Sequence, residues 1–429
     1  MTGASPIALA IDVALPRRDD MLDVGRIAQR LSALLLDTGR YPIASVTLAR
    51  VNYHAGKTVR AVYRIDVDGV SHTVAARMFA DAHAAERVYR RAEAVARPVD
   101  RLRGVVYDPL LRTVFWTFPN DRKIVGLDAA VTAALPQAVN DSRPVSRRLV
   151  AYAPEKAATF VCETTAQAPV GYLKVTVDDQ ADRDRRSYDR LQSALAADER
   201  SLRLPRALAF SDRRVLWLEP VAGRRIAASL GTDVELSDLE RLGVALAIFH
   251  GLPLGDAPSF DRFSASHLEV DVAMIALVRP DIARAARALG QRLIDATTAG
   301  NGVVCLHGDL HPKNAIAGTD AMALIDVENV AAGPAAADLG SLLASLVYRR
   351  ATGGLSAHGC RSRAHAFLSG YASRRRLPSR GSLAWHTAAA LFRERAVRAV
   401  KRIRPLGLDV LPALLTTSER LLERGLEEL

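Results

Sequence analysis

Residues 303–340 read VVCLHGDLHPKNAIAGTDAMALIDVENVAAGPAAADLG, and they form the most informative stretch of the chain. The apolar run VVCL predicts a strand that carries Asp309 just beyond its end. A proline-containing loop then leads to Asn314, and a hairpin that turns at 318–320 returns along AMALI to Asp326. We therefore expect two carboxylates and one carboxamide around a single pocket.

These residue types suit phosphoryl transfer. Mg²⁺ binds a few protein oxygens together with phosphate and water, and Asp326 and Asn314 supply such oxygens. Asp309 would accept the proton of an attacking hydroxyl group. The alternative is a hairpin whose acidic residues are turn formers, which is the interpretation that fits Asp320. His311 is not expected to bind metal, because no second His or Cys stands at ligand spacing.

The two motifs resemble those of the aminoglycoside phosphotransferase / choline kinase-like family. HGDLHPKN at 307–314 is similar to the family's HGDLHPxN pattern, and IDVE, GP and DLG within 325–340 resemble its second motif. The resemblance implies an α+β, protein-kinase-like bilobal fold. It also implies that Asp309 is the catalytic base, that Asn314 and Asp326 hold Mg²⁺, and that Asp338 supports the loop.

The resemblance extends upstream through single positions. Lys174, in the strand GYLKV, takes the place of the lysine that contacts the α- and β-phosphates; otherwise it is a half-exposed strand residue. Its acidic partner on the next helix is expected to be Asp184, with Asp182 as the second candidate. The segment LEPVAG resembles the hinge between the lobes, where backbone groups of Glu219 and Val221 would bind adenine. The expected phosphate-covering loop, APEKAA, departs from many relatives because it lacks glycine.

The first half of the chain contains an internal repeat. Residues 43–118 read as three strands, a helix and further strands, with a turn at Asp68-Gly69, and the same order returns roughly 100 residues later. The second copy has Lys174 where the first has Arg77. The matched pairs are Tyr53 with Tyr152, Trp116 with Trp217 and Pro119 with Pro220. The alternative to duplication is a chance likeness between two antiparallel sheets.

We predict three parts and a linker. The N-terminal part repeats the small-lobe pattern without its lysine, so we predict that it is non-catalytic. It resembles the cap that precedes the kinase lobes of maltokinases. The parts are a cap (1–135), a linker (135–146), a small lobe (146–223), and a mainly helical large lobe (224–429) with the catalytic loop (307–314) and the metal segment (325–328).

Composition sets broad limits. The 429 residues carry a net charge of +11, which comes from arginine because there are only six lysines. This charge fits either a GC-rich genome or an acidic partner such as nucleotide phosphates. Three scattered cysteines form no disulfide or zinc pattern and fit a reducing cytosol. No signal peptide or membrane span is expected, so we predict a cytoplasmic protein that binds no membrane.

The prediction is a kinase that transfers the γ-phosphoryl group of ATP, or of GTP, to a hydroxyl of a sugar or similar small molecule. An aminoglycoside antibiotic phosphotransferase is the alternative enzyme, although polycationic acceptors need acidic pockets. A catalytically inactive kinase-like scaffold is the alternative of another class. A nucleic-acid binder is not expected, because the arginines accompany no known binding motif. The sequence does not predict an oligomeric state.

Overall fold

The computed structural model describes residues 9–36, 42–132, 144–196, 199–229, 235–296 and 302–429. The predicted linker at 135–146 falls almost entirely outside these residues, and the next strand already begins at Val145. The predicted α+β class is confirmed, with antiparallel sheets in the first half and mostly helices in the second.

The first sheet has the strand order β1-β2-β3-β5-β4. The predicted turn between β2 and β3 is confirmed, because Asp68 and Gly69 both have positive φ, as a tight two-residue hairpin requires. The elements are α1 (Val24–Leu35), β1 (Ile43–His54), β2 (Thr58–Val67), β3 (Val70–Phe79), α2 (Ala82–Glu93), β4 (Val105–Asp108) and β5 (Thr113–Thr117).

The second sheet repeats this topology. Its order, β10-β11-β8-β7-β6, is the order of the first sheet with each strand replaced by its counterpart, and a helix follows the third strand in both. The elements are β6 (Val145–Ala153), β7 (Ala157–Thr164), β8 (Pro169–Thr176), α4 (Gln180–Ala194), β10 (Ala207–Asp212) and β11 (Val215–Leu218).

Strand register supports the duplication. Arg77 on β3 stands opposite Arg60 on β2, and Lys174 on β8 stands opposite Thr159 on β7. Thr159 lies 99 positions after Arg60, the same separation as between Tyr53 and Tyr152. Arg77 is therefore the structural counterpart of Lys174.

Each copy also repeats one hydrogen-bond arrangement, in which a carboxylate accepts from a tyrosine hydroxyl and from a backbone N–H in the turn that follows. Asp12 plays this part in the first copy and Asp121 in the second. The donors are Tyr53 Oη (2.7 Å) and Gly56 N (2.8 Å) to Asp12, and Tyr152 Oη (2.8 Å) and Glu155 N (2.7 Å) to Asp121.

The two sheets share a hydrophobic core, to which α2 and the short helix α3 (Leu127–Thr132) contribute. Trp116 of the first sheet donates its indole N–H to the Tyr152 hydroxyl of the second at 2.8 Å. The ring of Phe118 meets that of Tyr152 edge to face, with centroids 5.2 Å apart. The first sheet is therefore packed against the second.

The second half is mainly helical. The predicted strand at VVCL is β13 (Val304–Leu306), which pairs with β16 (Ala331–Gly333), and the predicted hairpin is formed by β14 (Ala315–Ala317) and β15 (Met322–Leu324). The hairpin joins β9 (Leu202–Arg203) and β12 (Arg224–Arg225) in a small sheet. The helices include α5 (Ile226–Ser229), α6 (Glu235–Phe249), α7 (Ala265–Val278), α8 (Ala283–Asp295), α9 (Ala336–Ala351), α10 (Ala357–Ala372), α11 (Arg380–Ala390), a π-helix (Leu391–Val397), α12 (Arg398–Arg402), α13 (Pro405–Asp409) and α14 (Leu411–Arg424).

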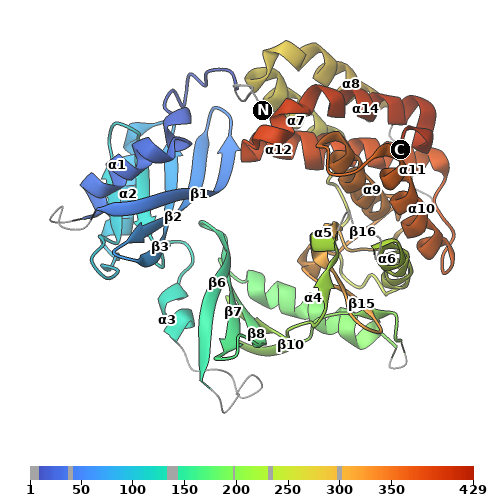
Figure 1. The fold of residues 1–429 in the computed structure, drawn as a ribbon, viewed down its shortest axis with the longest axis horizontal. Helices are drawn as coiled ribbons and strands as arrows, with labels where there is room; N and C mark the ends of the chain where they lie inside the picture. The colour runs from blue at the N-terminus through green and yellow to red at the C-terminus, as the bar shows by residue number, and fades with distance from the viewer. Residues whose placement is uncertain (1–8, 37–41, 133–143, 197–198, 230–234, 297–301) are drawn as a thin grey trace.

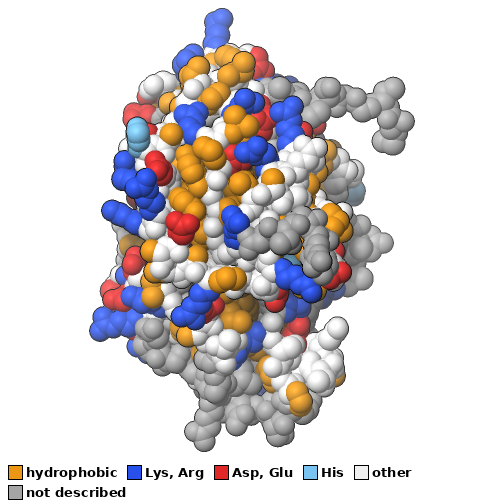
Figure 2. All heavy atoms as spheres, turned by 90° about the vertical axis from the view of Figure 1, so that its left-hand side faces the viewer, with side chains coloured by type: hydrophobic (Ala, Val, Ile, Leu, Met, Phe, Trp, Pro, Cys, Tyr) orange, Lys and Arg blue, Asp and Glu red, His pale blue; other side chains and the backbone are white. Residues whose placement is uncertain are grey.

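Figure 1 shows the first sheet between the second sheet and the C-terminal helices. Arg402 on α12 donates to the backbone carbonyl of Val51 on β1 at 2.9 Å, so the first sheet contacts both other parts of the chain. On the face seen in Figure 2, lysine and arginine side chains are scattered among apolar and acidic ones. None of the described helices is long and apolar enough to cross a membrane.

Candidate active site

The loop after β13 depends on Gly308. Its φ is +75°, and a Cβ atom there would lie 1.9 Å from the backbone oxygen of Asn329. Only glycine fits such a conformation and such a close approach. The neighbouring His307 points its Nε2 at the carbonyl oxygen of Ile325, 2.9 Å away. That contact ties the first motif to the second.

Asp338, at the N-terminal end of α9, stabilises the loop through hydrogen bonds. Its buried carboxylate accepts the backbone N–H groups of His307 (2.7 Å) and Gly308 (3.0 Å). Burial alone would raise the pKa of Asp338, but these bonds and the one to His250 keep that pKa below its ordinary value. The His250 ring lies between Asp338 (3.1 Å) and the Tyr371 hydroxyl (2.9 Å).

Asn314 is buried within the same loop. Its side-chain Nδ2 donates to the backbone oxygen of Asp309 at 3.1 Å. Its backbone carbonyl oxygen accepts from the backbone N–H of Ile325 at 3.0 Å. The Nδ2 bond fixes the carboxamide and leaves Oδ1 without a hydrogen bond among the described residues. An oxygen oriented in this way suits a divalent cation.

Asp326 lies just before a short 3₁₀ turn, in the left-handed conformation, with φ +59°. Its carboxylate forms no hydrogen bond or ion pair with any described residue. Partial desolvation in the cleft and the nearby charge of Glu328 raise the pKa of Asp326. An unsatisfied carboxylate of this kind fits a cation ligand, and the described residues include no cluster of three or more His, Cys, Asp or Glu that could hold a metal alone.

Asp309 lies beside two arginines and a histidine. Its carboxylate lies 3.5 Å from Arg262, 3.9 Å from Arg398 and 3.9 Å from His311. Burial would raise the pKa of Asp309, but attraction to His311, Arg262 and Arg398 keeps it below the ordinary value. Asp309 is thus ionised at neutral pH and able to accept a hydrogen bond from a hydroxyl group.

Lys174 meets two carboxylates. Its Nζ donates to Asp184 at 3.0 Å and to Glu328 at 2.6 Å. Burial would lower the pKa of Lys174, but Glu328 and Asp184 raise it above its ordinary value. Asp182, the other acid considered from the sequence, instead pairs with Arg186 at 2.7 Å.

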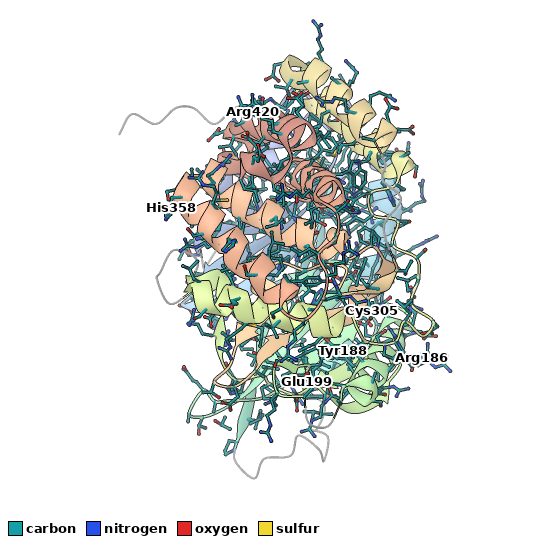
Figure 3. The ribbon with its side chains drawn as sticks, turned by 90° about the vertical axis from the view of Figure 1, so that its right-hand side faces the viewer. Arg186, Tyr188, Glu199, Cys305, His358 and Arg420 are labelled. Carbon is teal, nitrogen blue, oxygen red and sulfur yellow. The ribbon has the colours of Figure 1, made fainter. Side chains whose placement is uncertain are left out.

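Tyr188 on α4 lies beside Glu328, which pairs with Lys174. It is buried, and its hydroxyl lies 3.5 Å from Glu328, whereas Arg186 on the same helix lies at the molecular edge (Figure 3). The inward face of α4 thus supplies Asp184 and Tyr188.

A cavity of about 280 Å³ lies between the second sheet and the hairpin. Strands β6 to β8 form its roof, and the hairpin and the turn after it form its floor. Four of the residues predicted from the sequence line it: Lys174, Glu219, Val221 and Asp326. Asp184 lies behind Lys174, and neither Asp309 nor Asn314 lines this cavity.

The segment after β11 leaves backbone groups free. The N–H of Glu219 is bonded to the carbonyl of Arg206 at 3.0 Å, and its side chain pairs with Arg206 at 2.8 Å. The Glu219 carbonyl and the Val221 N–H have no partner among the described residues. These two groups, rather than the Glu219 N–H, are thus available to a ligand in the cavity.

The model of the phosphotransferase enzyme family matches residues 15–377, which is most of the chain. The chain belongs to this phosphotransferase family. The predicted family is thereby confirmed, and with it the enzyme class, a kinase with an alcohol acceptor. The likeness of the first sheet to a maltokinase cap, and the three-part division of the chain, stay predictions. No curated protein sequence matches this chain.

Solved structures with the protein-kinase-like fold are similar to this phosphotransferase. A choline kinase from Cryptosporidium parvum is 12% identical, covering 66% of this chain and 90% of its own, with a TM-score of 0.45. A choline/ethanolamine kinase family protein from Mesorhizobium loti is 15% identical (70% and 95% covered, TM-score 0.46). A spectinomycin phosphotransferase, solved with ADP and spectinomycin, is 10% identical (67% and 95% covered, TM-score 0.46). Likeness this low says nothing about the acceptor.

In this phosphotransferase the turn between β6 and β7, which the sequence predicts to cover the phosphates, contains no glycine. Glu155 itself adopts the left-handed conformation, with φ +61°. Its buried carboxylate accepts from Arg77 (2.7 Å) and Arg60 (3.1 Å) of the first sheet and from Arg122 (3.3 Å). Arg77, the counterpart of Lys174, thus binds the turn of the other copy.

Sequence reasoning missed several of these residues. Glu328 is the last residue of the quoted IDVE motif. Its place in that motif was the signal from which its contact with Lys174 could have been predicted. Glu155, Arg262 and Arg398 gave no local signal, because their partners are distant in the sequence.

Proposed function

We propose that this phosphotransferase is an ATP-dependent small-molecule kinase that phosphorylates a hydroxyl group of a sugar or similar metabolite. The observation that carries the proposal is the single cavity shared by Lys174, Glu219, Val221 and Asp326. These residues come from three separate segments. Each has the chemistry that its place in a nucleotide site requires.

The adenine base would bind the free Glu219 carbonyl and Val221 N–H. Lys174 would contact the α- and β-phosphates, and its hydrogen bonds to Asp184 and Glu328 would orient its side chain. A raised pKa keeps the Lys174 ammonium charged, which favours anionic phosphates over neutral ligands.

Asp326 and Asn314 would hold Mg²⁺, through a carboxylate and a carboxamide oxygen that have no partner among the described residues. When bound, the cation would neutralise charge on the phosphates. The amide of Asn314 is already oriented by its bond to Asp309 O, so the side chain would lose little conformational freedom when the cation binds.

Asp309 would orient the acceptor hydroxyl and take its proton. The hydroxyl oxygen forms a bond to the γ-phosphorus, the bond from this phosphorus to the β–γ bridging oxygen breaks, and ADP leaves with that electron pair. A carboxylate with a lowered pKa is a weak base, so the main contribution of Asp309 would be positioning of the hydroxyl until proton transfer becomes favourable late in the reaction.

A cytoplasmic location is part of the proposal. Cys162, Cys305 and Cys360 are buried free thiols. Such thiols fit a reducing compartment.

The test is a screen for acceptor-dependent release of ADP over sugars, amino sugars, choline-like alcohols and aminoglycosides. Wild-type protein should consume ATP with at least one acceptor class only when Mg²⁺ is present, and Asp309→Ala should abolish the acceptor-dependent part. If the protein does not bind Mg²⁺·ATP at all, the proposal is wrong and an inactive scaffold is the better interpretation.

A further inference from the structure

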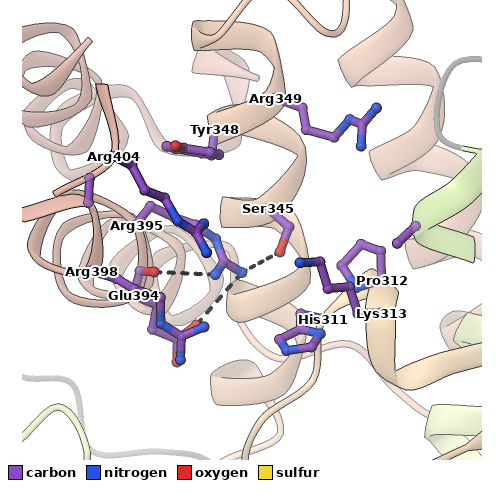
Figure 4. Close-up of a pocket in the computed structure, with 12 residues that line it drawn as sticks. His311, Pro312, Lys313, Ser345, Tyr348, Arg349, Glu394, Arg395, Arg398 and Arg404 are labelled. Carbon is purple, nitrogen blue, oxygen red and sulfur yellow. Dashed lines mark hydrogen bonds and ion pairs between the residues drawn. The ribbon is translucent and has the colours of Figure 1, made fainter. Parts of the chain in front are cut away.

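A second cavity, of about 220 Å³, is lined in part by the catalytic loop (Figure 4). It is lined by the loop at 311–313, by α9, by the π-helix and α12, and by Arg404. Two of its lining residues, His311 and Arg398, each lie 3.9 Å from the Asp309 carboxylate. A hydroxyl group in this cavity would be within reach of Asp309, so the cavity is a candidate for the acceptor site.

The walls of this cavity are strongly basic. Five lining side chains are Lys or Arg, and the one acidic lining side chain is Glu394. That carboxylate is already neutralised, because Arg262 binds it at 2.8 Å and Arg395 lies 3.9 Å away. No acidic side chain of the wall is thus free to bind a cationic acceptor.

Several of these cations lack a counter-charge. The side chains of Lys313 and Arg404 form no hydrogen bond or ion pair with any described residue, and the one ion-pair partner of the Arg398 side chain among those residues is Asp309. The positive groups therefore repel one another, and this repulsion would be relieved by a bound anion.

Arg395 is a buried polar anchor of the wall. Its side chain is only 10% exposed, it donates to the Ser341 carbonyl (3.2 Å) and to Ser345 Oγ, and its Nε has no partner. It comes from the π-helix, a rare element that often occurs at functional sites.

His311 faces the same cavity in neutral form. Burial, together with Arg395 and Arg398, lowers its pKa to about 4, and its Nδ1 is a buried atom without a partner. A neutral imidazole nitrogen beside Asp309 is suited to a hydrogen bond with the acceptor.

We propose that the acceptor is a small alcohol that already carries a phosphate group, held by Lys313, Arg398 and Arg404 with its reacting hydroxyl toward Asp309. This rests on the proposed function and names the substrate class of the same site. A phosphate monoester carries about −1.5 to −2 charges and three acceptor oxygens at neutral pH, which matches several unpaired cations better than one carboxylate does. A cavity of this volume, below the roughly 300–1,000 Å³ of common ligand sites, favours a small molecule.

The first experiment measures binding of inorganic phosphate by calorimetry. The protein is first loaded with Mg²⁺ and a non-hydrolysable ATP analogue, so that the γ-phosphate position is filled. We expect saturable binding that the double variant Lys313→Ala/Arg404→Ala weakens about 10- to 100-fold, the usual effect of losing charge-assisted hydrogen bonds. Arg284→Ala, which removes an exposed and unpaired arginine from α8, should leave the affinity unchanged.

Two results would overturn the proposal at this stage. One is the absence of saturable phosphate binding to the loaded protein, and the other is equal affinity in the double variant. If the ATP analogue itself does not bind, the proposed function fails and this proposal fails with it; if the analogue binds and phosphate does not, only this proposal fails.

The second experiment asks which of four hexoses displaces the bound phosphate: glucose, glucosamine, glucuronate or glucose 6-phosphate. They share a skeleton and differ in charge, and glucose 6-phosphate should compete best by tenfold or more. Stronger competition by glucuronate would show that the acceptor carries a carboxylate instead. Stronger competition by glucose or glucosamine would show that the cavity is not an anion site, and the proposal would be wrong.

Discussion

Asp309 carries the largest expected effect at the scale of one residue. Asp309→Asn keeps the size of the side chain and removes its charge, so turnover should fall by roughly 10²–10⁴ while affinity for Mg²⁺·ATP persists. Initial rates of ADP release and calorimetric titration of the nucleotide would separate the two effects. Asp320→Asn, at an exposed turn, is the matched control. Wild-type turnover in Asp309→Asn would contradict the assignment.

Asp326 gives a pH-dependent prediction. Its pKa is raised in the folded chain, and Mg²⁺ requires the ionised form, so nucleotide binding should weaken on acidification through that raised pKa, at a higher pH than for an ordinary aspartate. A carboxyl group whose pKa is raised on folding contributes less stability as the pH rises through it. Asp326→Asn should therefore raise the melting temperature of the nucleotide-free protein at neutral pH and weaken Mg²⁺-dependent binding at least tenfold.

A melting temperature that falls in Asp326→Asn, with Mg²⁺-dependent binding retained, would show that the carboxylate is structural. Calorimetric titrations at several pH values, with and without Mg²⁺, provide the binding half of the comparison.

Gly308 is required by backbone geometry. Gly308→Ala places a Cβ atom against the Asn329 carbonyl and forces a non-glycine residue to φ +75°. It should lower the free energy of unfolding by about 1–3 kcal/mol and reduce turnover more than nucleotide affinity. Gly381→Ala is the control, because nothing lies within 4 Å of its Cβ position and it stands in a helix. Urea unfolding curves would show the difference, and equal stability of the two variants would contradict it.

At the scale of elements, the turn between β6 and β7 is held by the first sheet through Glu155. Glu155→Gln leaves Arg60 and Arg77 without their shared counter-charge, so the free energy of unfolding should fall by roughly 1–3 kcal/mol. The KM for ATP should rise several-fold, since the turn lies where a phosphate-covering loop is expected.

Glu163→Gln on β7 is the matched control for this change. Glu163 pairs with Arg148, whose side chain is 62% exposed, and such a surface pair contributes little. An unchanged KM for ATP in Glu155→Gln would show that this contact stabilises the sheets without positioning the nucleotide.

The elements also show where local signals suffice. The strands of both sheets, the turn at Asp68-Gly69 and the hairpin after Asn314 follow from alternation and turn residues in the sequence. The π-helix does not, because residues 391–397 read as ordinary helix; in the fold this segment packs against α9 and α14. The turn at 153–158 has no glycine, and its left-handed residue is Glu155, which is stabilised by bonds to Asp121 and to three arginines.

At the scale of the whole molecule, the first sheet connects the second sheet to the C-terminal helices. It binds the second sheet through Glu155 and the shared core, and it binds α12 through the Arg402–Val51 contact. At the position that corresponds to Lys174, the first sheet therefore has an arginine that binds the second sheet.

Nucleotide binding should stabilise the whole chain. At a concentration 100 times the Kd, Mg²⁺·ATP should add about 2.7 kcal/mol to the free energy of unfolding. Lys174→Met should remove most of this gain, because Asp184 and Glu328 then face the phosphates without a cation. The gain can be measured by thermal unfolding of both proteins with Mg²⁺·ATP, with ATP and EDTA, and without nucleotide. The same shift in Lys174→Met as in wild type would contradict the placement of the phosphates.

The sequence by itself determined the family and the α+β class, because each depends on short motifs or on local periodicity. It also predicted an internal repeat, and the proposed cation ligands, Lys174 and the hinge could be predicted from such motifs. Only the tertiary structure showed that Asp184 and Glu328 share Lys174, that Glu155 is held by the other sheet, and that unpaired cations line a cavity beside Asp309. Arg77 and Glu155 are 78 positions apart and Lys174 and Glu328 are 154 apart, and electrostatic interactions at such separations depend on the folded distances, which no local pattern encodes.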